Sequence, residues 1–513
     1  MSRFYLTTAI DYSNGDPHIG HAYEKIGADA IARFHRLHGR DVHFLIGMDE
    51  HGQKVLQTAA SLGIAPQQLV DRLAERFAST WARLGISNDQ FIRTTSPEHV
   101  RGVRALLERI LERNEGDFYE KAYEGWYCVG CEAFKQPAEI ADGKCVLHPT
   151  RTLEWVQERN WFFRLSRYQD FLRRHLEAHP EFVQPESRRN EVLGWLDQGL
   201  EDVSASRSRF AWGVPFPKRT SDGEQQTTYV WFDALPNYLT ATGFPDAISE
   251  GRWPASLHVV GKDITRFHAV IWPAILESAQ LPLPERVWAH GFVLLGGDRF
   301  SKSGGVKLDL DEAIGRFGPD AFRYFLLREV PFDADGNFSW ERFEERYNAD
   351  LANAWGNLVS RVVSMIERYR GGITPAGAQG ESDRVDLTDV QEYVAAMDGS
   401  RGYLLHEALR TVFRMVARSN EFVQSSAPWA VAKDPAKSKQ LDDILASLSR
   451  QLIRQCILLS PFMPERAQAA WRQLGGTGEL SSQRLASLGT LESAGWRVAK
   501  GEPLFPRIEK PAT

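Results

Sequence analysis

The sequence has few cysteines, no long apolar run and no excess of positive charge. Only four of its 513 residues are cysteine, which is too few for a disulfide scaffold. No run of about eighteen uninterrupted apolar residues occurs, so no membrane-spanning helix is predicted, and no basic leader precedes the first apolar stretch. We therefore expect a cytoplasmic protein with no membrane contact.

The charge balance and two missing motifs limit the possible functions. The net charge of −6 argues against extensive electrostatic binding of nucleic acid, so any RNA contact should depend on a few local side chains. The sequence contains neither a glycine-rich dinucleotide fingerprint nor a glycine-lysine-serine phosphate loop, which disfavours dehydrogenases and ordinary NTPases. Its length predicts three or four domains, at roughly 100 to 200 residues each.

A pair of histidines follows the first apolar run of the chain. Residues 4–10 predict a strand, and helical spacing of apolar residues begins soon after, so His18, Gly20 and His21 lie at the N-terminus of a first helix. That position carries unpaired N–H groups and the positive end of the helix dipole. A phosphate group is therefore the ligand that we expect beside the two histidines.

The next apolar run, residues 42–46, predicts a second strand that ends beside Asp49. Strand, helix and strand form a right-handed parallel unit, so we predict a doubly wound, Rossmann-like α/β domain. Ligands in such sheets bind at the carboxyl ends of the strands, which places Asp49 beside the histidine turn. The sequence then predicts a long helix over 53–84, a strand at 91–93 and a helix over 98–113.

An insertion with four metal-binding side chains interrupts the α/β pattern. Near residue 117 the composition becomes aromatic and short-stranded, and Cys128, Cys131, Cys145 and His148 follow. Two pairs of donors in two short turns are the Cys3His set that tetrahedral Zn2+ prefers. Because protein fills all four positions, such a zinc would be structural. Free structural thiols are the alternative interpretation.

Large aromatic residues mark the return to the α/β domain. Helix-like segments are predicted over 160–213, residues 228–238 predict a strand that runs into a turn, and 257–260 predict a strand that feeds a helix. An apolar aromatic pocket suits a thioether, because sulfur makes favourable contacts with ring edges. Four residues in these segments are candidates for such a pocket, with plain core packing as the alternative: Trp231, Tyr238, Phe267 and Trp272.

A glycine loop follows a strand predicted over 287–295. The segment 296–305 has glycines at both ends, so we expect a mobile loop in which Lys302 can swing onto a phosphate, with Ser301 and Ser303 beside it.

The last third of the chain predicts helices only. A connecting helix is expected over 311–328, and long helical patterns over 342–370, 387–423 and 439–459 predict an antiparallel bundle. Asn357 lies four residues before Arg361, so the two share one helix face.

Several of these segments together resemble one family. The stretch 7–23 resembles the signature of class I aminoacyl-tRNA synthetases, and the methionyl family in particular. The loop at 299–303 is similar to that family's lysine-methionine-serine-lysine-serine loop, with Arg299 and Phe300 in place of its first two residues. Residues 427–429, Ala-Pro-Trp, resemble the family's turn with a stacking tryptophan, and stacking an unpaired base is how proteins recognise single-stranded RNA.

The resemblance covers residues 4–508 and implies an enzyme that activates methionine. ATP and methionine would give methionyl-adenylate and pyrophosphate, and the methionyl group would pass to the 3′-terminal adenosine of tRNA(Met), for initiation and elongation of protein synthesis. The attacking group is the substrate's own carboxylate, so the site must supply charge stabilisation and proximity rather than a nucleophile.

The resemblance also implies roles for individual residues. The catalytic set is His18, His21 and Lys302. The ATP-binding set is His18, Gly20, His21, Gly261, Asp263, Val293, Ser301, Lys302 and Ser303. The methionine-binding set is Ala9, Ile10, Tyr12, Asp49, Trp231, Leu235, Tyr238, Ile264 and His268. The anticodon set is Asn357, Arg361, Pro428 and Trp429. Asp11 departs from the family, whose members often have an apolar or aromatic residue there.

The resemblance implies a domain order as well. Residues 1–117 and 227–295 would form the two halves of the catalytic domain, 118–226 the insertion, 296–340 the mobile loop with its connecting segment, and 341–513 the anticodon-binding bundle. One structural Zn2+, Mg2+ with ATP, and tRNA(Met) as partner are expected. We expect a monomer, because the dimerising barrel that some relatives carry is not present.

Two other functions fit parts of the sequence. A sister synthetase for another apolar amino acid is one, although the interval 117–227 is too short for the hydrolytic editing insertion of the valine, leucine and isoleucine enzymes. The other is a non-catalytic RNA-binding relative, which the altered Arg299 and Phe300 would suit. Amino-acid-dependent pyrophosphate exchange separates these alternatives.

Overall fold

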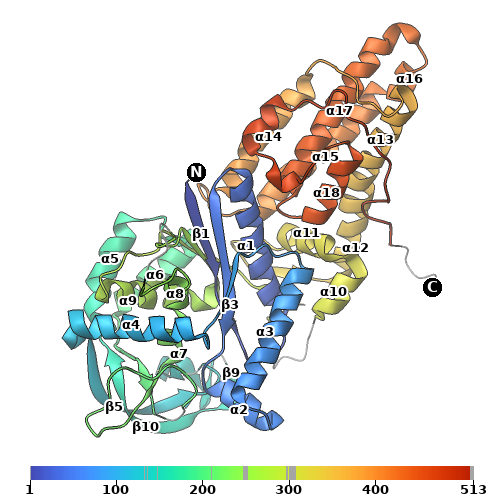
Figure 1. Cartoon of the computed structure of the whole chain (residues 1–513). Helices are drawn as coiled ribbons and strands as arrows, with labels where there is room; N and C mark the ends of the chain where they lie inside the picture. The colour runs from blue at the N-terminus through green and yellow to red at the C-terminus, as the bar shows by residue number, and fades with distance from the viewer. Residues whose placement is uncertain are drawn as a thin grey trace.

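The computed structural model describes residues 2–508 except 132, 136, 147, 209–210, 247–251, 296–297 and 300–307. Within that part of the chain, no helix is both long enough and apolar enough to cross a membrane. An α/β region with a small β-rich insertion lies at one end of the molecule and a helical bundle at the other (Figure 1). The predicted fold class, a doubly wound parallel sheet followed by a helix bundle, is confirmed.

A seven-stranded sheet, in which every neighbouring pair runs parallel, organises the α/β region. Its strands are β11 (Val183–Gln184), β16 (Val287–His290), β15 (Leu257–Gly261), β1 (Arg3–Thr8) and β3 (Asp41–Asp49) in spatial order, with β2 (Asp11–Tyr12) and β4 (Gln90–Arg93) both paired to β3. From β1 the chain continues outward to β3 and β4 on one side, and later returns to the other side of β1 to form β15 and then β16. The crevice between β1 and β15 is therefore the switch point where such sheets bind ligands.

Helices cover both faces of this sheet. Helix α1 (Ile19–Leu37) lies on one face and joins the core that continues into the bundle, whereas α4 (Pro97–Arg113) and α9 (Trp272–Ser278) lie on the other face (Figure 1). The prediction of a single helix over 53–84 is wrong. This segment forms two helices, α2 (Gln53–Leu62) and α3 (Pro66–Arg83), because Gly63 ends the first in a left-handed conformation and Pro66 begins the second.

The second half of the α/β region differs from prediction in two places. Residues 228–238 form only a short strand, β14 (Thr227–Thr228), followed by α7 (Val230–Ala234) and α8 (Asn237–Thr240). The strand predicted over 287–295 stops at His290, and the next strand, β17 (Val293–Leu295), pairs with β18 (Asp298–Arg299) and β19 (Gly336–Phe338) instead. The chain turns at Gly291, where a Cβ would lie 2.1 Å from the carbonyl oxygen of Ala334.

The insertion is built on a long antiparallel ribbon of β5 (Phe118–Cys128) and β10 (Glu154–Phe163), flanked by β6 (Ala133–Phe134) and β12 (Val203–Ser204). A second small sheet contains β7 (Ile140–Ala141), β8 (Lys144–Cys145) and β9 (His148–Thr152). Residues 160–163, expected to begin a helical region, belong to β10 because they pair in register with β5. Helices α5 (Gln169–Ala178) and α6 (Glu186–Gln198) follow as predicted.

The remaining helices connect the sheet to the bundle and form the bundle itself. The predicted connecting helix is two, α10 (Leu310–Phe317) and α11 (Pro319–Glu329), divided by Gly318 at φ 82° before a proline. The pattern over 387–423 also contains two helices, because residues 398–404 form a turn with Gly399 and Gly402 at positive φ. The bundle consists of α12 (Trp340–Arg346), a π-helical segment (Tyr347–Gly356), α13 (Asn357–Arg370), α14 (Glu381–Met397), α15 (Leu405–Ser426), α16 (Pro428–Val431), α17 (Ser438–Leu459) and α18 (Pro464–Gln473).

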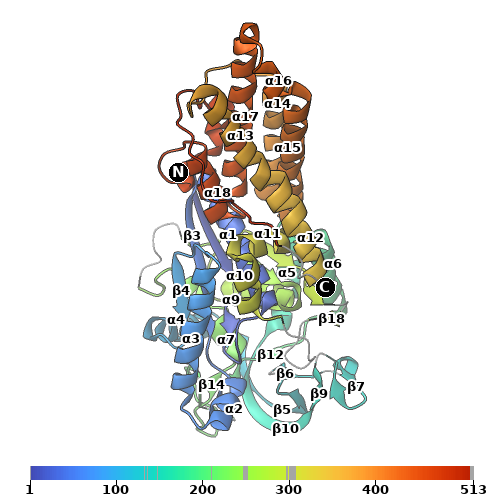
Figure 2. The same cartoon turned by 90° about the vertical axis from the view of Figure 1, so that its right-hand side faces the viewer.

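Figure 2 shows the bundle stacked on the end of the sheet at which β1 and β3 begin, with α10 and α11 beside α1 at the junction. Arg323 of α11 ties this junction together. Its guanidinium contacts Asp29 of α1 at 2.7 Å and donates to the carbonyls of Phe462 and Pro461 at 2.9 and 2.8 Å. All these residues are buried, so the junction is part of the core rather than a loose linker.

Candidate active site

A cavity of about 1700 Å³ opens at the carboxyl ends of the central strands. It lies at the switch point beside β1 and β15. Every predicted ATP-binding and methionine-binding residue in the described part of the chain lines it: Ala9, Ile10, Tyr12, His18, Gly20, His21, Asp49, Trp231, Leu235, Tyr238, Gly261, Asp263, Ile264, His268 and Val293. The sequence stretches that predicted a nucleotide site and an aromatic pocket thus meet in one cavity.

The two histidines at the start of α1 cap the helix with one ring nitrogen each. His18 is the N-cap residue, and its Nδ1 accepts a hydrogen bond from the backbone N–H of Gly20 at 3.1 Å. His21 Nδ1 accepts from the N–H of His18 at 3.3 Å, and the two rings stack with centroids 3.7 Å apart. Because each Nδ1 acts as an acceptor, the neutral ring carries its proton on Nε2. Both histidines can therefore donate a hydrogen bond to an anion.

The aromatic side of the cavity holds a buried, neutral histidine. The Trp231 and Phe267 rings stack with centroids 3.7 Å apart. His268 Nδ1 lies 3.0 Å from the carbonyl of Ile264 and so donates to it, which leaves Nε2 to accept from the Tyr238 hydroxyl at 2.7 Å. Burial lowers the pKa of His268 to about 4, so its imidazole is neutral near pH 7. Stacked aromatic rings beside a neutral imidazole suit an apolar side chain.

The local backbone explains this arrangement and one failure of prediction. Residues Phe267–Ile271 form a π-helical turn before α9, a conformation that often marks functional sites and has no sequence signature. Trp272, a candidate for the aromatic pocket, is completely buried and packs against Trp253 with centroids 5.9 Å apart. It does not line the cavity, so for this residue the core-packing alternative is correct.

A buried carboxylate that the sequence did not reveal fixes the helix that carries part of the aromatic side. Asp233, in α7, binds His51 Nδ1 at 2.6 Å and His99 Nε2 at 3.0 Å. Burial alone would raise the pKa of Asp233, but the charge and hydrogen bond of His51 lower it to about 2. The pKa of His51 is correspondingly raised, with Asp233 outweighing the effect of burial. Asp233 therefore anchors α7, the helix that carries Trp231.

Most of the predicted glycine loop lies outside the described residues. These are Phe300, Ser301, Lys302 and Ser303, together with the glycines around them. The flanking strands are described: β17 pairs antiparallel with β18, with Leu294 opposite Arg299. Val293, at the start of β17, lines the cavity.

The four predicted metal ligands converge in the insertion. One donor atom from each of Cys128, Cys131, Cys145 and His148 lies within 4.8 Å of all the others. The Cys131 sulfur is 3.3 Å from His148 Nδ1 and 3.6 Å from the Cys145 sulfur. A Cβ on Gly130 would lie 2.5 Å from the His148 ring, so the turn between the first two cysteines has no room for a side chain. Three thiols and an imidazole at this spacing can hold a tetrahedral metal ion.

The predicted anticodon residues lie in the bundle. Asn357 is exposed and Arg361 half-buried on α13, and Trp429 of α16 is 42% exposed. Two contacts show that α15 runs in the same direction as the π-helical segment (Tyr347–Gly356) that leads into α13. Phe413 lies 5.0 Å from the Tyr324 ring, whose hydroxyl binds Asp350, and seven residues later Asn420 donates to the carbonyl of Ala354. The end of α15 and the start of α13 are therefore neighbours, and α16 lies at the far end of the bundle (Figure 1).

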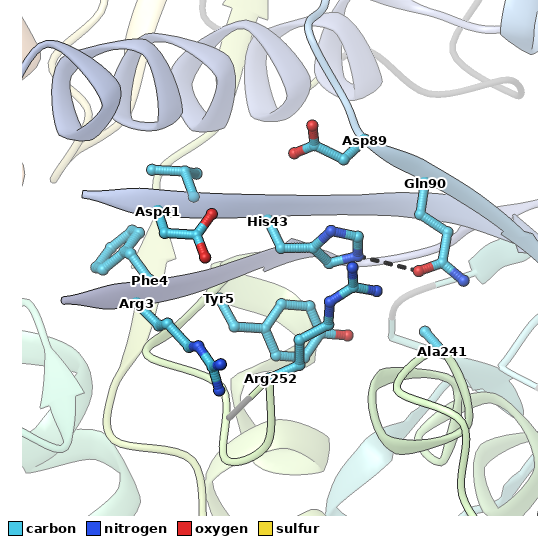
Figure 3. Close-up of a pocket in the computed structure, with 10 residues that line it drawn as sticks. Arg3, Phe4, Tyr5, Asp41, His43, Asp89, Gln90, Ala241 and Arg252 are labelled. Carbon is cyan, nitrogen blue, oxygen red and sulfur yellow. Dashed lines mark hydrogen bonds between the residues drawn. The ribbon is translucent and has the colours of Figure 1, made fainter. Parts of the chain in front are cut away.

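A second cavity, of about 640 Å³, lies at the opposite edge of the sheet, where β1, β3 and β4 begin (Figure 3). Acidic and basic side chains line it together, including Arg3, Asp41 and Arg252, and His43 Nε2 is bonded to Gln90 Oε1 at 3.0 Å. None of the predicted site residues lines this cavity, so the larger cavity is the candidate active site.

Tyr5, which lines the smaller cavity, is bonded to Tyr238, which lines the larger one. The Tyr5 hydroxyl donates to the Tyr238 carbonyl at 2.8 Å.

Comparison with known protein families gives a match over most of the chain. Residues 4–363 match the family model described as tRNA synthetases class I (M). The methionine–tRNA ligase of Caldanaerobacter subterraneus subsp. tengcongensis is 44% identical over 99% of this chain and 79% of its own length. The methionine–tRNA ligase of Brucella suis is also 44% identical, over 99% of this chain and 98% of its own length.

Solved structures give the same result. The Mycobacterium tuberculosis methionyl-tRNA synthetase in complex with methionyl-adenylate superposes with a TM-score of 0.92 at 40% identity, covering 99% of this chain and 100% of that one. The apo form of the same protein superposes with a TM-score of 0.85 at 37% identity, covering 100% of this chain and 99% of that one.

Proposed function

The chain belongs to the methionyl family of class I tRNA synthetases, and from that premise we propose which of its residues carry out the reaction. The activity is that of a methionine–tRNA ligase. The methionine carboxylate attacks the α-phosphorus of ATP and pyrophosphate leaves. A hydroxyl of the terminal adenosine of tRNA then attacks the methionyl carbonyl of the adenylate, and AMP leaves. One observation carries the assignment of residues: the histidine turn and the aromatic side share one cavity at the switch point of the sheet.

His18 and His21 stabilise the charge that develops on the α-phosphate. Each donates from Nε2, since Nδ1 is used for capping, and both lie at the positive end of α1. Lys302 adds a positive charge from the glycine loop. Asp263 binds the ATP ribose, Val293 the adenine, and Gly261, Gly20, Ser301 and Ser303 complete the ATP-binding set.

The aromatic side binds methionine. Trp231 and Tyr238 contact the thioether, and neutral His268 closes the pocket without adding a charge. Asp49 binds the substrate ammonium, which turns the carboxylate toward the α-phosphate. The rest of the methionine-binding set lines the same side: Ala9, Ile10, Tyr12, Leu235 and Ile264.

The metal site of the insertion holds one Zn2+, bound by Cys128, Cys131, Cys145 and His148. Protein donors occupy all four positions, so its role is to stiffen an insertion that has little core of its own. Mg2+ enters with ATP as the counter-ion of its phosphates. Counting zinc in the purified protein by elemental analysis checks this assignment, with one ion per chain expected.

The bundle recognises the anticodon of tRNA(Met). Trp429 stacks on an unpaired base, Pro428 sets its turn, and Asn357 and Arg361 read the edge of a base from α13. We also propose that the protein is monomeric and works in the cytoplasm.

Pyrophosphate exchange with each of the twenty amino acids tests the proposal. We expect exchange with methionine and little with the others. The Lys302→Ala variant should exchange at least about 100-fold more slowly, because a group that stabilises transition-state charge is lost. Exchange with a different amino acid would instead support a sister synthetase, and no exchange would support a non-catalytic RNA-binding protein.

A further inference from the structure

Lys25 is a fully buried cation beside the candidate active site. It lies one helical turn after His21 on α1, and its side chain is 0% exposed. It does not itself line the cavity, although its partners Ala9, Asp11 and Glu24 do. A buried ammonium is energetically expensive unless it is fully paired, so its presence behind the cavity surface requires an explanation.

Three acceptors use all three N–H groups of the ammonium. Lys25 Nζ lies 2.7 Å from the Ala9 carbonyl, 3.0 Å from Asp11 Oδ1 and 2.9 Å from Glu24 Oε1. The Thr8 hydroxyl also reaches the Ala9 carbonyl, at 3.0 Å. Burial lowers the pKa of Lys25, but the two carboxylates outweigh it and raise the pKa above its usual value. The side chain is therefore charged under all physiological conditions.

The first two acceptors define a corner of the backbone on the methionine side of the cavity. The N–H of Ala9 donates to β15 at the Val259 carbonyl, 3.2 Å away. Two residues later Asp11 pairs with β3 instead, opposite Met48. The chain therefore leaves β15 between Ala9 and Asp11, at the crevice itself. Lys25 holds both ends of this corner, which carries the proposed methionine-binding residue Ile10.

The third acceptor leads to the ATP side of the cavity. The other carboxylate oxygen of Glu24 lies 3.2 Å from His290 Nε2, at the end of β16. His290 Nδ1 contacts the carbonyl of Gly291 at 2.7 Å, in the turn that directs the chain to Val293. The pair formed by Glu24 and Lys25 thus connects the methionine side with the strand that leads to the proposed adenine contact.

This cluster is poorly explained by stability alone. Burial raises the pKa of Asp11 to about 6, even though the charge of Lys25 lowers it. The ion pair therefore does not fully offset the cost of burying the Asp11 carboxylate. Two carboxylates share one ammonium, and that ammonium also donates a hydrogen bond to the backbone carbonyl of Ala9 at the cavity.

We propose that Lys25 is a positioning residue for methionine activation. Its buried ammonium fixes the position of the methionine side of the cavity relative to the ATP side. This inference rests on the proposed function. Lys25 touches neither substrate and acts through Ala9, Asp11 and Glu24. Because a misplacement of about 1 Å can cost about 100-fold in rate, a small shift of the corner is enough to slow the attack on ATP.

The Lys25→Met variant tests the proposal, since methionine has a similar length and no charge. We expect kcat for pyrophosphate exchange to fall about 10- to 100-fold, with a smaller change in the KM for ATP and a lower melting temperature. A second variant, Lys25→Met with Asp11→Asn, removes one of the two carboxylates that lose the ammonium. It should regain part of the melting temperature, while kcat stays low because the Ala9 carbonyl still lacks its charged donor.

Asp29→Asn is the matched control. Asp29 is a buried charge on the same helix, paired with Arg33 and Arg323 on the side that faces the bundle. Its loss should lower the melting temperature and leave kcat unchanged. The proposal is overturned if Lys25→Met keeps the wild-type kcat, or if the double variant regains kcat together with stability. Failure of the proposed function would look different, because the wild-type protein itself would then show no methionine-dependent exchange.

Discussion

The α/β region and the helical bundle each bury a network of charges, and the two networks differ in their cations. At the cavity, the ammonium of Lys25 binds two carboxylates and a backbone carbonyl. In the bundle, Asp383 of α14 accepts hydrogen bonds from Arg450 and Arg454 of α17 at 3.1 and 2.9 Å, and from the N–H of Gly380 at 3.0 Å. The arginines lower the pKa of Asp383 even though burial alone would raise it.

The difference follows from the chemistry of the two cations. A guanidinium is a rigid fork that fixes the relative orientation of two helices, whereas an ammonium is a compact charge that can gather acceptors from several directions. The bundle network joins α14 to α17 and does not contact the larger cavity. Similar burial of charge can therefore serve packing in one region and the geometry of a reaction in another. Substitutions should therefore affect stability and activity separately.

The largest expected effect is on the catalytic side. His21→Ala removes a donor that faces the proposed phosphate site, so pyrophosphate exchange should fall about 100- to 1000-fold. The free energy of unfolding should fall by only about 0.5 to 2 kcal/mol, because the variant also loses one cap of α1. His38→Ala, an exposed histidine just after the end of the same helix, is the control and should exchange normally. Equal effects from both variants would contradict the role of the histidine turn.

The next effect belongs to the bundle. Asp383→Ala leaves two buried guanidinium groups without their carboxylate and should destabilise the protein by about 3 to 5 kcal/mol. Exchange by the folded enzyme at 25 °C should stay near the wild-type rate. Denaturant unfolding followed by circular dichroism, with exposed Glu381→Ala as control, measures the change. A large loss of exchange in the folded variant would show that the bundle network supports the reaction after all.

Trp429→Ala should affect only the second half-reaction. A stacked base contributes about 1 to 3 kcal/mol, so kcat/KM for charging tRNA should fall by a factor of about 5 to 150, while exchange without tRNA is unchanged. Val385→Ala, another exposed apolar residue of the bundle, is the control and should leave both assays unchanged. If Trp429→Ala weakened both assays alike, its role in the anticodon site would be wrong.

The smallest effect comes from a matched pair of tyrosines. Tyr5 donates to the carbonyl of Tyr238, a proposed methionine-binding residue, and Tyr393 donates to the Leu458 carbonyl in the bundle, both at 2.8 Å. Changing either to phenylalanine should cost about 0.5 to 1.5 kcal/mol of stability. Only Tyr5→Phe should also raise the KM for methionine, by a few-fold. A similar rise in Tyr393→Phe would erase the distinction between the two regions.

Much of the fold was predictable because its signals are local. The first strand, the histidine turn and α4 follow from apolar periodicity and caps, and the cluster of Cys128, Cys131, Cys145 and His148 follows from their spacing. The errors came where a break has only a weak local signal. The pattern over 53–84 reads as one helix although Gly63 and Pro66 divide it.

The residues of the candidate site were predictable, whereas the contacts that hold them in place were not. The resemblance named residues that line the cavity, and each of those in the described part of the chain does so. It did not reveal what holds them. Asp233 lies 182 residues from His51 and 134 from His99, so no local pattern connects the three. Trp272 looked like a pocket residue, but the π-helical turn before it directs it into the core.

The local sequence specifies which chemical groups are available: two histidines on a helix N-terminus, three cysteines and a histidine that can bind a metal ion, and helices in the last third of the chain. Which of these groups meet depends on the tertiary fold. The ammonium of Lys25 reaches Ala9 and Asp11 because α1 packs back across β1, and Tyr5 supports Tyr238 from 233 residues away. Periodicity and capping depend on neighbours within a turn or a strand, whereas these contacts depend on how the whole sheet closes around its switch point.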